Sequence, residues 1–315
     1  MSGLDVGIFE QFFRLDNNSS NSILKAFLGS GIDDMEGGVC MNFDLRTCDA
    51  AYYFVLDFMN MTPDEYITEL IINCGNDFET FWNRNIERIK SVDISGLRLM
   101  AFHVVGSLDG CREIKEKGLM NLQTVLSEET TLKRLLERAG VTFDIQNKLV
   151  FCNGKSYDID YEKYRGHHFL TGIDEKLDKV AHRVYYDFCV NGFMANDNVY
   201  NYGTNIHERP EFLMTLGELL PQAQKVETFW KNKAESYRVD FYATVDQVHR
   251  FNFELDEYRD PPYEGWFELD DEMKLKKWML SHAIDRAHDD LGMTFLYVKD
   301  DVTIPTNQII SVSEI

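Results

Sequence analysis

A single histidine within an apolar run is the residue whose type and setting most clearly suggest chemistry. His103 lies in residues 97–105, where every other residue except Arg98 is apolar. Such a run is typical of a buried strand. An imidazole on a buried strand that faces a cleft can hold the hydroxyl groups of a ligand. The sequence therefore indicates a candidate binding site at His103, followed by a turn and a short helix over residues 111–117.

The order of residues around this histidine resembles a known family. His103, Ile114 and the pair Gly118-Leu119 are similar to the first strand and following helix of the ADP-ribosyltransferase superfamily, in its histidine–tyrosine–glutamate branch. Residues 295–298, 302–305 and 308–315 resemble the closing strands of that family, in which a proline-containing turn leads to a final edge strand. The resemblance implies an α+β fold with a mixed split-sheet core that binds NAD, as a substrate, in a cleft.

The resemblance also implies roles for individual residues. His103 would hydrogen-bond the ribose next to the nicotinamide, and Tyr200 or Tyr202 would stack on the nicotinamide ring. Val104 and Gly106 would lie along the bound NAD. Breaking the glycosidic bond develops positive charge on the ribose, so a nearby carboxylate would stabilise it.

The position of that carboxylate departs from the family pattern. The family's glutamate would begin the strand expected at residues 294–298, where neither Met293 nor Thr294 is acidic. The candidates for its role are Asp289 and Asp290, just before this strand, and Glu211, at the start of the helix after Tyr202.

Polar residues are concentrated at 205–211, around the expected start of a helix. Helix N-termini attract anions, so Arg209 could contact the diphosphate of NAD. The alternative is a network of side chains that only caps the helix.

Periodicity and turn signals outline the elements that would position these residues. A mainly helical N-terminal segment, residues 1–95, precedes an α+β core domain, residues 96–315, with a hairpin inserted near 141–160. Helices are expected at 19–27, 62–74, 78–89, 127–139, 174–190, 210–220, 222–233 and 270–291. Strands are expected at 97–105, 141–145, 148–152, 155–159, 198–202, 237–243, 294–298 and 308–312.

Two local signals support this outline. Thr62-Pro63-Asp64-Glu65 has the form of a capping box with proline in the first helical turn. Asn153-Gly154 between alternating runs predicts a two-residue hairpin turn.

Composition excludes several classes of protein. The 315 residues carry a net charge of −21, from 53 acidic and 32 basic side chains, which argues against nonspecific nucleic-acid binding. The six cysteines are widely spaced, as expected for reduced thiols in the cytoplasm. The N-terminus lacks signal-peptide features, and no apolar run reaches the roughly 18 residues of a membrane span.

Other catalytic signatures are missing. The sequence has no phosphate-binding glycine loop and no G-x-S-x-G elbow. Residues 282–289 carry histidines and aspartates at helical spacing, yet no complete metal-ligand set is visible, so no metal is expected.

Two functions are consistent with these observations. The first is an NAD-dependent ADP-ribosyltransferase, a glycosyltransferase that modifies a protein or nucleic acid; the family includes toxins and effectors of antiviral (phage) defence. The alternative is a noncatalytic interaction protein that uses the helical N-terminal segment and the acidic surface to bind a basic protein partner. The acidic residues 254–272 are either a solvated loop or a segment that occupies a basic groove, on this protein or on a partner.

Overall fold

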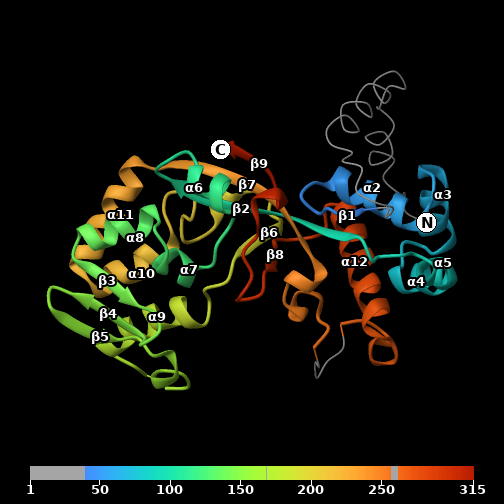
Figure 1. Cartoon of the computed structure of the whole chain (residues 1–315). Helices are drawn as coiled ribbons and strands as arrows, with labels where there is room; N and C mark the ends of the chain where they lie inside the picture. Colours follow the sequence, from blue (N-terminus) through green and yellow to red (C-terminus); the bar gives the residue numbers. More distant parts are fainter. Residues whose placement is uncertain (1–39, 168, 257–261) are drawn as a thin grey trace, which may run out of the picture. The chain divides into compact units, whose positions relative to one another are not determined.

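One long strand organises the sheet at the centre of the described chain (Figure 1). The computed structural model describes residues 40–167, 169–256 and 262–315. Strand β2 (Leu97–Ser107) pairs antiparallel with β7 (Glu235–Thr244) along nearly its whole length. Its other edge is shared by β1 (Met41–Phe43), which is parallel to it, and β6 (Asn191–Ala195), which is antiparallel. The strand expected around His103 is thus confirmed.

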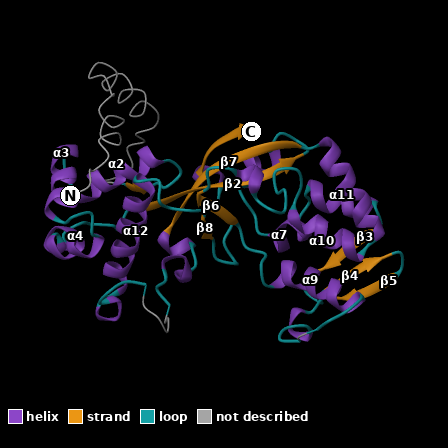
Figure 2. Cartoon of the chain, turned by 180° about the vertical axis from the view of Figure 1, so that it is seen from behind, coloured by secondary structure: helices purple, strands orange, loops and turns teal. Residues whose placement is uncertain are grey.

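The sheet continues beyond these neighbours on both sides. Strand β8 (Thr294–Tyr297) pairs with β6, and β9 (Ile309–Glu314) pairs with β7, which gives the order β8-β6-β2-β7-β9. The two strands expected near the C-terminus are therefore present, and both pair within the main sheet. Figure 2 shows this sheet in orange, with the C-terminal strand at its edge.

A separate three-stranded meander contains the predicted hairpin. It consists of β3 (Val141–Asp144), β4 (Leu149–Cys152) and β5 (Lys155–Asp158), paired in that order. Between β4 and β5, Asn153 and Gly154 have φ of 51° and 76°. Positive φ at both central residues matches the twist of the flanking strands, so the hairpin prediction is confirmed.

The described helices mostly follow the apolar periodicity of the sequence. Their bounds are α2 (Cys48–Met59), α3 (Pro63–Ile67), α4 (Phe78–Arg84), α5 (Ile86–Lys90), α6 (Arg112–Lys117), α7 (Leu122–Ser127), α8 (Thr131–Arg138), α9 (Ile173–Tyr185), α10 (Glu211–Leu219), α11 (Pro221–Lys233) and α12 (Asp271–Ala287). The capping box of Thr62 and Glu65 begins α3 as predicted. The helix expected at 19–27 lies outside the described residues.

Several predicted bounds were wrong. The helix expected at 62–74 continues after α3 as a π-helical turn, Thr68–Asn73. The helix expected at 78–89 is interrupted at Asn85, and the one expected at 127–139 begins only at Thr131, where the Thr130 side chain accepts from the Lys133 amide. Polar residues that bond the backbone locally end or start helices in this way.

Two errors concern the region beside His103. The helix expected at 174–190 ends at Tyr185, and residues 191–195 form the strand β6. Asn191-Gly192, a pair of the kind that ends helices, instead begins a strand that pairs with β2 and β8. The strand expected at 198–202 is instead a short 3₁₀ turn, Val199–Asn201.

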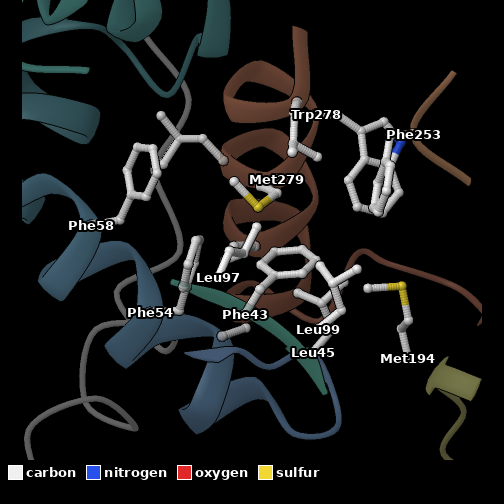
Figure 3. Packing of buried hydrophobic residues seen from close by; sticks show 14 of the residues in the cluster. Phe43, Leu45, Phe54, Phe58, Leu97, Leu99, Met194, Phe253, Trp278 and Met279 are labelled. Carbon is white, nitrogen blue, oxygen red and sulfur yellow. The ribbon is translucent and has the colours of Figure 1, made fainter. Parts of the chain in front are cut away.

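The largest apolar core joins the main sheet to the helices that precede it in sequence. Phe43 of β1, Leu97 and Leu99 of β2, and Trp278 and Met279 of α12 are all buried in one cluster (Figure 3). Helix α2 packs against α12 within the same cluster. Residues from 41 onward therefore share a core with residues of the predicted 96–315 domain.

A second apolar cluster lies under the meander. It includes Val141 and Val150 of β3 and β4, Val180 of α9, Leu213 of α10 and Val226 of α11. All six cysteines are described and carry free thiols. No helix in the described part of the chain is long and apolar enough to cross a membrane.

Candidate functional site

A hollow of about 380 Å³ lies where β2, β6 and β8 meet the start of α10. This volume is within the range of small-molecule sites. Of the nine candidate site residues, five line it: His103, Val104, Tyr202, Arg209 and Glu211. Ile114, Gly118 and Leu119, which carry the family resemblance, line it as well. The fold thus gathers side chains from positions more than 100 residues apart.

His103 is held in one orientation by its neighbour strand. Its Nδ1 lies 2.7 Å from the backbone carbonyl oxygen of Asn191, the first residue of β6. A carbonyl oxygen only accepts, so Nδ1 carries the proton and Nε2 offers a lone pair. Burial lowers the pKa of His103, although the Asn191 carbonyl opposes this shift. Nε2 has no hydrogen-bond partner among the described residues, so a neutral imidazole is left to accept from a ligand hydroxyl.

An aromatic wall forms another side of the hollow. The rings of Tyr202 and Phe193 meet edge to face with centroids 5.5 Å apart, and Phe295 lies 5.2 Å from Phe193. All three residues line the hollow. Rings fixed by mutual packing provide an apolar wall whose ring faces and edges a planar ligand group can contact.

A carboxylate and a guanidinium meet at the start of α10. Glu211 pairs with Arg183 of α9, and Arg183 also pairs with Asp187. Burial raises the pKa of Glu211, while the charge of Arg183 lowers it. The charge of Glu211 in turn contributes to a raised pKa of Tyr202, whose main cause is burial. An acidic group therefore lies close to the aromatic wall.

Arg209 is committed to partners within the protein. Its side chain is buried; Nε donates to Glu227 at 2.8 Å, and Nη1 donates to the carbonyl oxygens of Thr204 and Asn205. These bonds tie the loop before α10 to α11. The geometry favours a structural role for Arg209 over a contact with a diphosphate. The network is not the expected helix cap, however, because no side chain caps the start of α10.

Four other sequence candidates do not line the hollow. Tyr200 is 52% exposed and packs edge to face on His207. Asp289 and Asp290 lie exposed after α12. Gly106 is required for packing: a Cβ there would lie 2.5 Å from the backbone carbonyl carbon and oxygen of Glu208.

Gly118 and Leu119 have a structural explanation as well. Gly118 has φ of 85°, and a Cβ there would lie 2.1 Å from the carbonyl oxygen of Ile304. Leu119 and Ile304 exchange two backbone hydrogen bonds of 2.9 Å. The Gly-Leu pair therefore fastens the chain after α6 to the segment between β8 and β9.

Sequence reasoning missed Arg183, Asp187 and Asn191 as site residues. Arg183 and Asp187 are four residues apart, which predicts a solvent-facing ion pair on a helix. Asn191 acts through its backbone carbonyl, which carries no signal in the sequence. Only the pairing of β6 with β2 brings the Asn191 carbonyl to His103, and Arg183 and Asp187 line the same hollow.

Comparisons with known proteins add no relative. No family model matches the chain, and neither the curated proteins nor the solved structures contain a match.

Proposed function

We propose that the hollow binds NAD⁺ and that the protein transfers ADP-ribose to a macromolecular acceptor, on an ADP-ribosyltransferase-like core. One observation carries the proposal: an imidazole, a tyrosine ring and a carboxylate, from His103, Tyr202 and Glu211, line a single hollow. The resemblance assigned these residue types to ribose binding, nicotinamide stacking and charge stabilisation. Tyr202 is preferred over Tyr200 for stacking because Tyr200 does not line the hollow.

Each residue has a physical role in this proposal. The Nε2 atom of His103 accepts a ribose hydroxyl, and the ring of Tyr202 offers its face or edge to the nicotinamide. The bound substrate supplies a glycosidic bond whose cleavage places positive charge on the ribose. Glu211 would supply the negative charge that stabilises it.

The charge of the hollow supports a cationic ligand group. Its acidic lining residues outnumber the basic ones: Glu113, Asp187 and Glu211 against Arg183 and Arg209. The nicotinamide ring of NAD⁺ is positively charged and would be attracted. Arg183 is half-buried, so its guanidinium can exchange a carboxylate for a phosphate, whereas Arg209 is sealed in its own network.

Calorimetry with NAD⁺ tests binding. Tyr202 and Tyr200 lie two residues apart, so the alanine variant of Tyr200 serves as the matched control for that of Tyr202. Tyr202→Ala and His103→Ala should each weaken NAD⁺ binding by about tenfold, the loss of one good contact or hydrogen bond. Tyr200→Ala should leave it unchanged. Equal effects of Tyr200→Ala and Tyr202→Ala would contradict the assignment of the ring.

Transfer is tested with labelled NAD⁺ and cell extract. Glu211→Gln keeps a hydrogen-bonding group but removes the charge, so label transfer should fall by about 10²-fold or more while NAD⁺ affinity changes little. Asp289→Asn should transfer label as the unaltered protein does. If the folded protein binds no NAD⁺, the proposal fails, and the interaction protein with an acidic surface becomes the better interpretation.

A further inference from the structure

A cysteine, a histidine and an aspartate from three separate segments converge beside the hollow. The Sγ atom of Cys189, one ring nitrogen of His249 and one carboxylate oxygen of Asp300 all lie within 4.8 Å of one another. His249 Nε2 is 3.2 Å from Asp300 Oδ1. Within the described residues, no other group of three or more such side chains is gathered in this way. None of the three was singled out by the sequence as a ligand.

Backbone hydrogen bonds hold the three segments together. The His249 amide donates to the Tyr297 carbonyl at 3.0 Å, and the Val298 amide donates to the Val190 carbonyl at 3.0 Å. The carbonyl of Asp300 accepts from the Asn121 side chain at 2.7 Å. The ring of His249 is further fixed by stacking on Phe251. The donors are therefore placed by the fold before any ligand binds.

We propose that Cys189, His249 and Asp300 form a zinc site at the edge of the hollow. Thiolate, imidazole and carboxylate are the three ligand types that zinc takes, and a site with three protein ligands keeps a fourth position for water. Zn–N and Zn–O bonds of about 2.0–2.2 Å place two tetrahedral ligands about 3.3 Å apart. The separation of His249 Nε2 and Asp300 Oδ1 already matches that spacing.

The remaining atoms need only a small adjustment. Ligand pairs that include sulfur are about 3.6 Å apart in a tetrahedral zinc site, so no separation within 4.8 Å has to shorten by more than about 1.2 Å. Calcium and magnesium are disfavoured because they select oxygen ligands over thiolate. Burial, together with the charges of Asp187 and Asp300, raises the pKa of the Cys189 thiol to about 12, so Zn²⁺ would displace the thiol proton as it binds.

The same residues fit a thiol nucleophile less well. A catalytic imidazole uses one nitrogen for the nucleophile and the other for the orienting carboxylate. Here the Sγ of Cys189 donates to the Asn191 side-chain oxygen at 3.1 Å, and His249 Nε2 faces Asp300. No hydrogen bond joins Cys189 to His249 among the described residues. The cluster is arranged as three converging donors, as a metal requires.

Cobalt substitution tests the site without reference to NAD⁺. The chelator-treated protein is titrated with Co²⁺, whose bond to a thiolate gives a near-ultraviolet charge-transfer band, and then with Zn²⁺ in competition. We expect one equivalent to bind with the band. Cys189→Ala should abolish the band, while Cys48→Ala, which removes another half-buried thiol, should retain it.

The other two ligands are tested by affinity. His249→Ala and Asp300→Ala should each weaken Zn²⁺ binding by at least about tenfold, the loss caused by removing even an outer partner of a metal site. Thermal unfolding without metal shows whether each variant folds. The same excess of Zn²⁺ should raise the midpoint of the unaltered protein and of Cys48→Ala by more than that of the three ligand variants. Absence of the thiolate band, or its persistence in Cys189→Ala, would overturn the proposal whatever the outcome with NAD⁺.

Discussion

Gly106→Ala is the substitution whose effect the structure defines most sharply. Gly106 lies in β2, and its carbonyl oxygen accepts from the indole of Trp230 at 2.8 Å. Its φ is not in the left-handed region, so alanine meets no backbone strain there. The added Cβ, however, would lie 2.5 Å from two backbone atoms of Glu208 and 2.8 Å from the amide nitrogen of Arg209. The cost of the substitution is therefore purely steric.

The magnitude follows from two opposing effects. Replacing glycine by alanine at an unstrained position stabilises a protein by about 0.4–1 kcal/mol, because the unfolded chain loses freedom. Overpacking costs about 1–3 kcal/mol, and the upper part of that range applies because the atoms met at Gly106 are backbone. We expect Gly106→Ala to lower the free energy of unfolding by about 1–2 kcal/mol.

Urea unfolding measures this change, with Gly292→Ala as the control. Gly292 also has no left-handed φ, but no atom lies within 4 Å of its added Cβ. The control should be as stable as the unaltered protein or slightly more stable. If the free energies of unfolding of the two variants differ by less than about 0.5 kcal/mol, which is no more than the error of the extrapolation, the steric reasoning is refuted. On the proposed function, NAD⁺ binding should weaken in Gly106→Ala as well, because the added Cβ displaces the loop at Glu208 and Arg209, and Arg209 lines the hollow.

Three further substitutions test other features of the fold. Burial lowers the pKa of His282 to about 4, so between about pH 6.5 and 4 the unfolded chain binds a proton that the folded chain does not, and stability falls as the pH drops. The free energy of unfolding measured in urea should therefore fall by about 2 kcal/mol less between about pH 7 and pH 5 in His282→Phe than in the unaltered protein. An equal fall in the two proteins would contradict this. In Gly154→Ala the added Cβ meets only open space, and the φ of 76° is the sole source of strain, so the free energy of unfolding should fall by about 1–2 kcal/mol. Thermal unfolding should show a larger loss of stability for Gly118→Ala, whose Cβ would also meet the Ile304 carbonyl oxygen. Arg286 is buried and donates to the Leu45 carbonyl at 3.0 Å, so Arg286→Met should cost about 2–3 kcal/mol by urea unfolding; a loss under about 0.5 kcal/mol would mean that water replaces the guanidinium.

Features with local causes were predictable from the sequence. The Asn153-Gly154 turn and the Thr62 capping box depend on residues next to one another, so their types suffice. The apolar run around His103 likewise predicts a buried strand wherever its partners lie. Helices α3 and α8 nevertheless differ from the expected helices at 62–74 and 127–139. Single polar residues that bond the backbone decide where each of these helices starts or ends.

Features with distant causes were not predictable. Strand β6 begins with Asn191-Gly192, and Gly192 is needed because a Cβ there would lie 2.8 Å from the ring of Phe241 on β7. Nothing near Gly192 in the sequence signals that approach. The choice of Tyr202 over Tyr200 depends on the 3₁₀ turn that contains Tyr200 and ends just before Tyr202. The ion pair of Arg183 with Glu211 joins two helices. The sequence could propose candidates for the site but could not choose among them.

Strand β2 has a consequence for how the protein opens. Leu99 and Ala101 belong to the core shared with α12, while Phe102 and Val104 pack in a smaller cluster with Phe193. The amides of β2 are hydrogen-bonded to neighbouring strands of the sheet, and they exchange with deuterium only when that pairing opens. Opening it disrupts both apolar clusters. The slowest-exchanging amides of the chain should therefore be those at the middle of β2, and their exchange rate reports the free energy of complete unfolding.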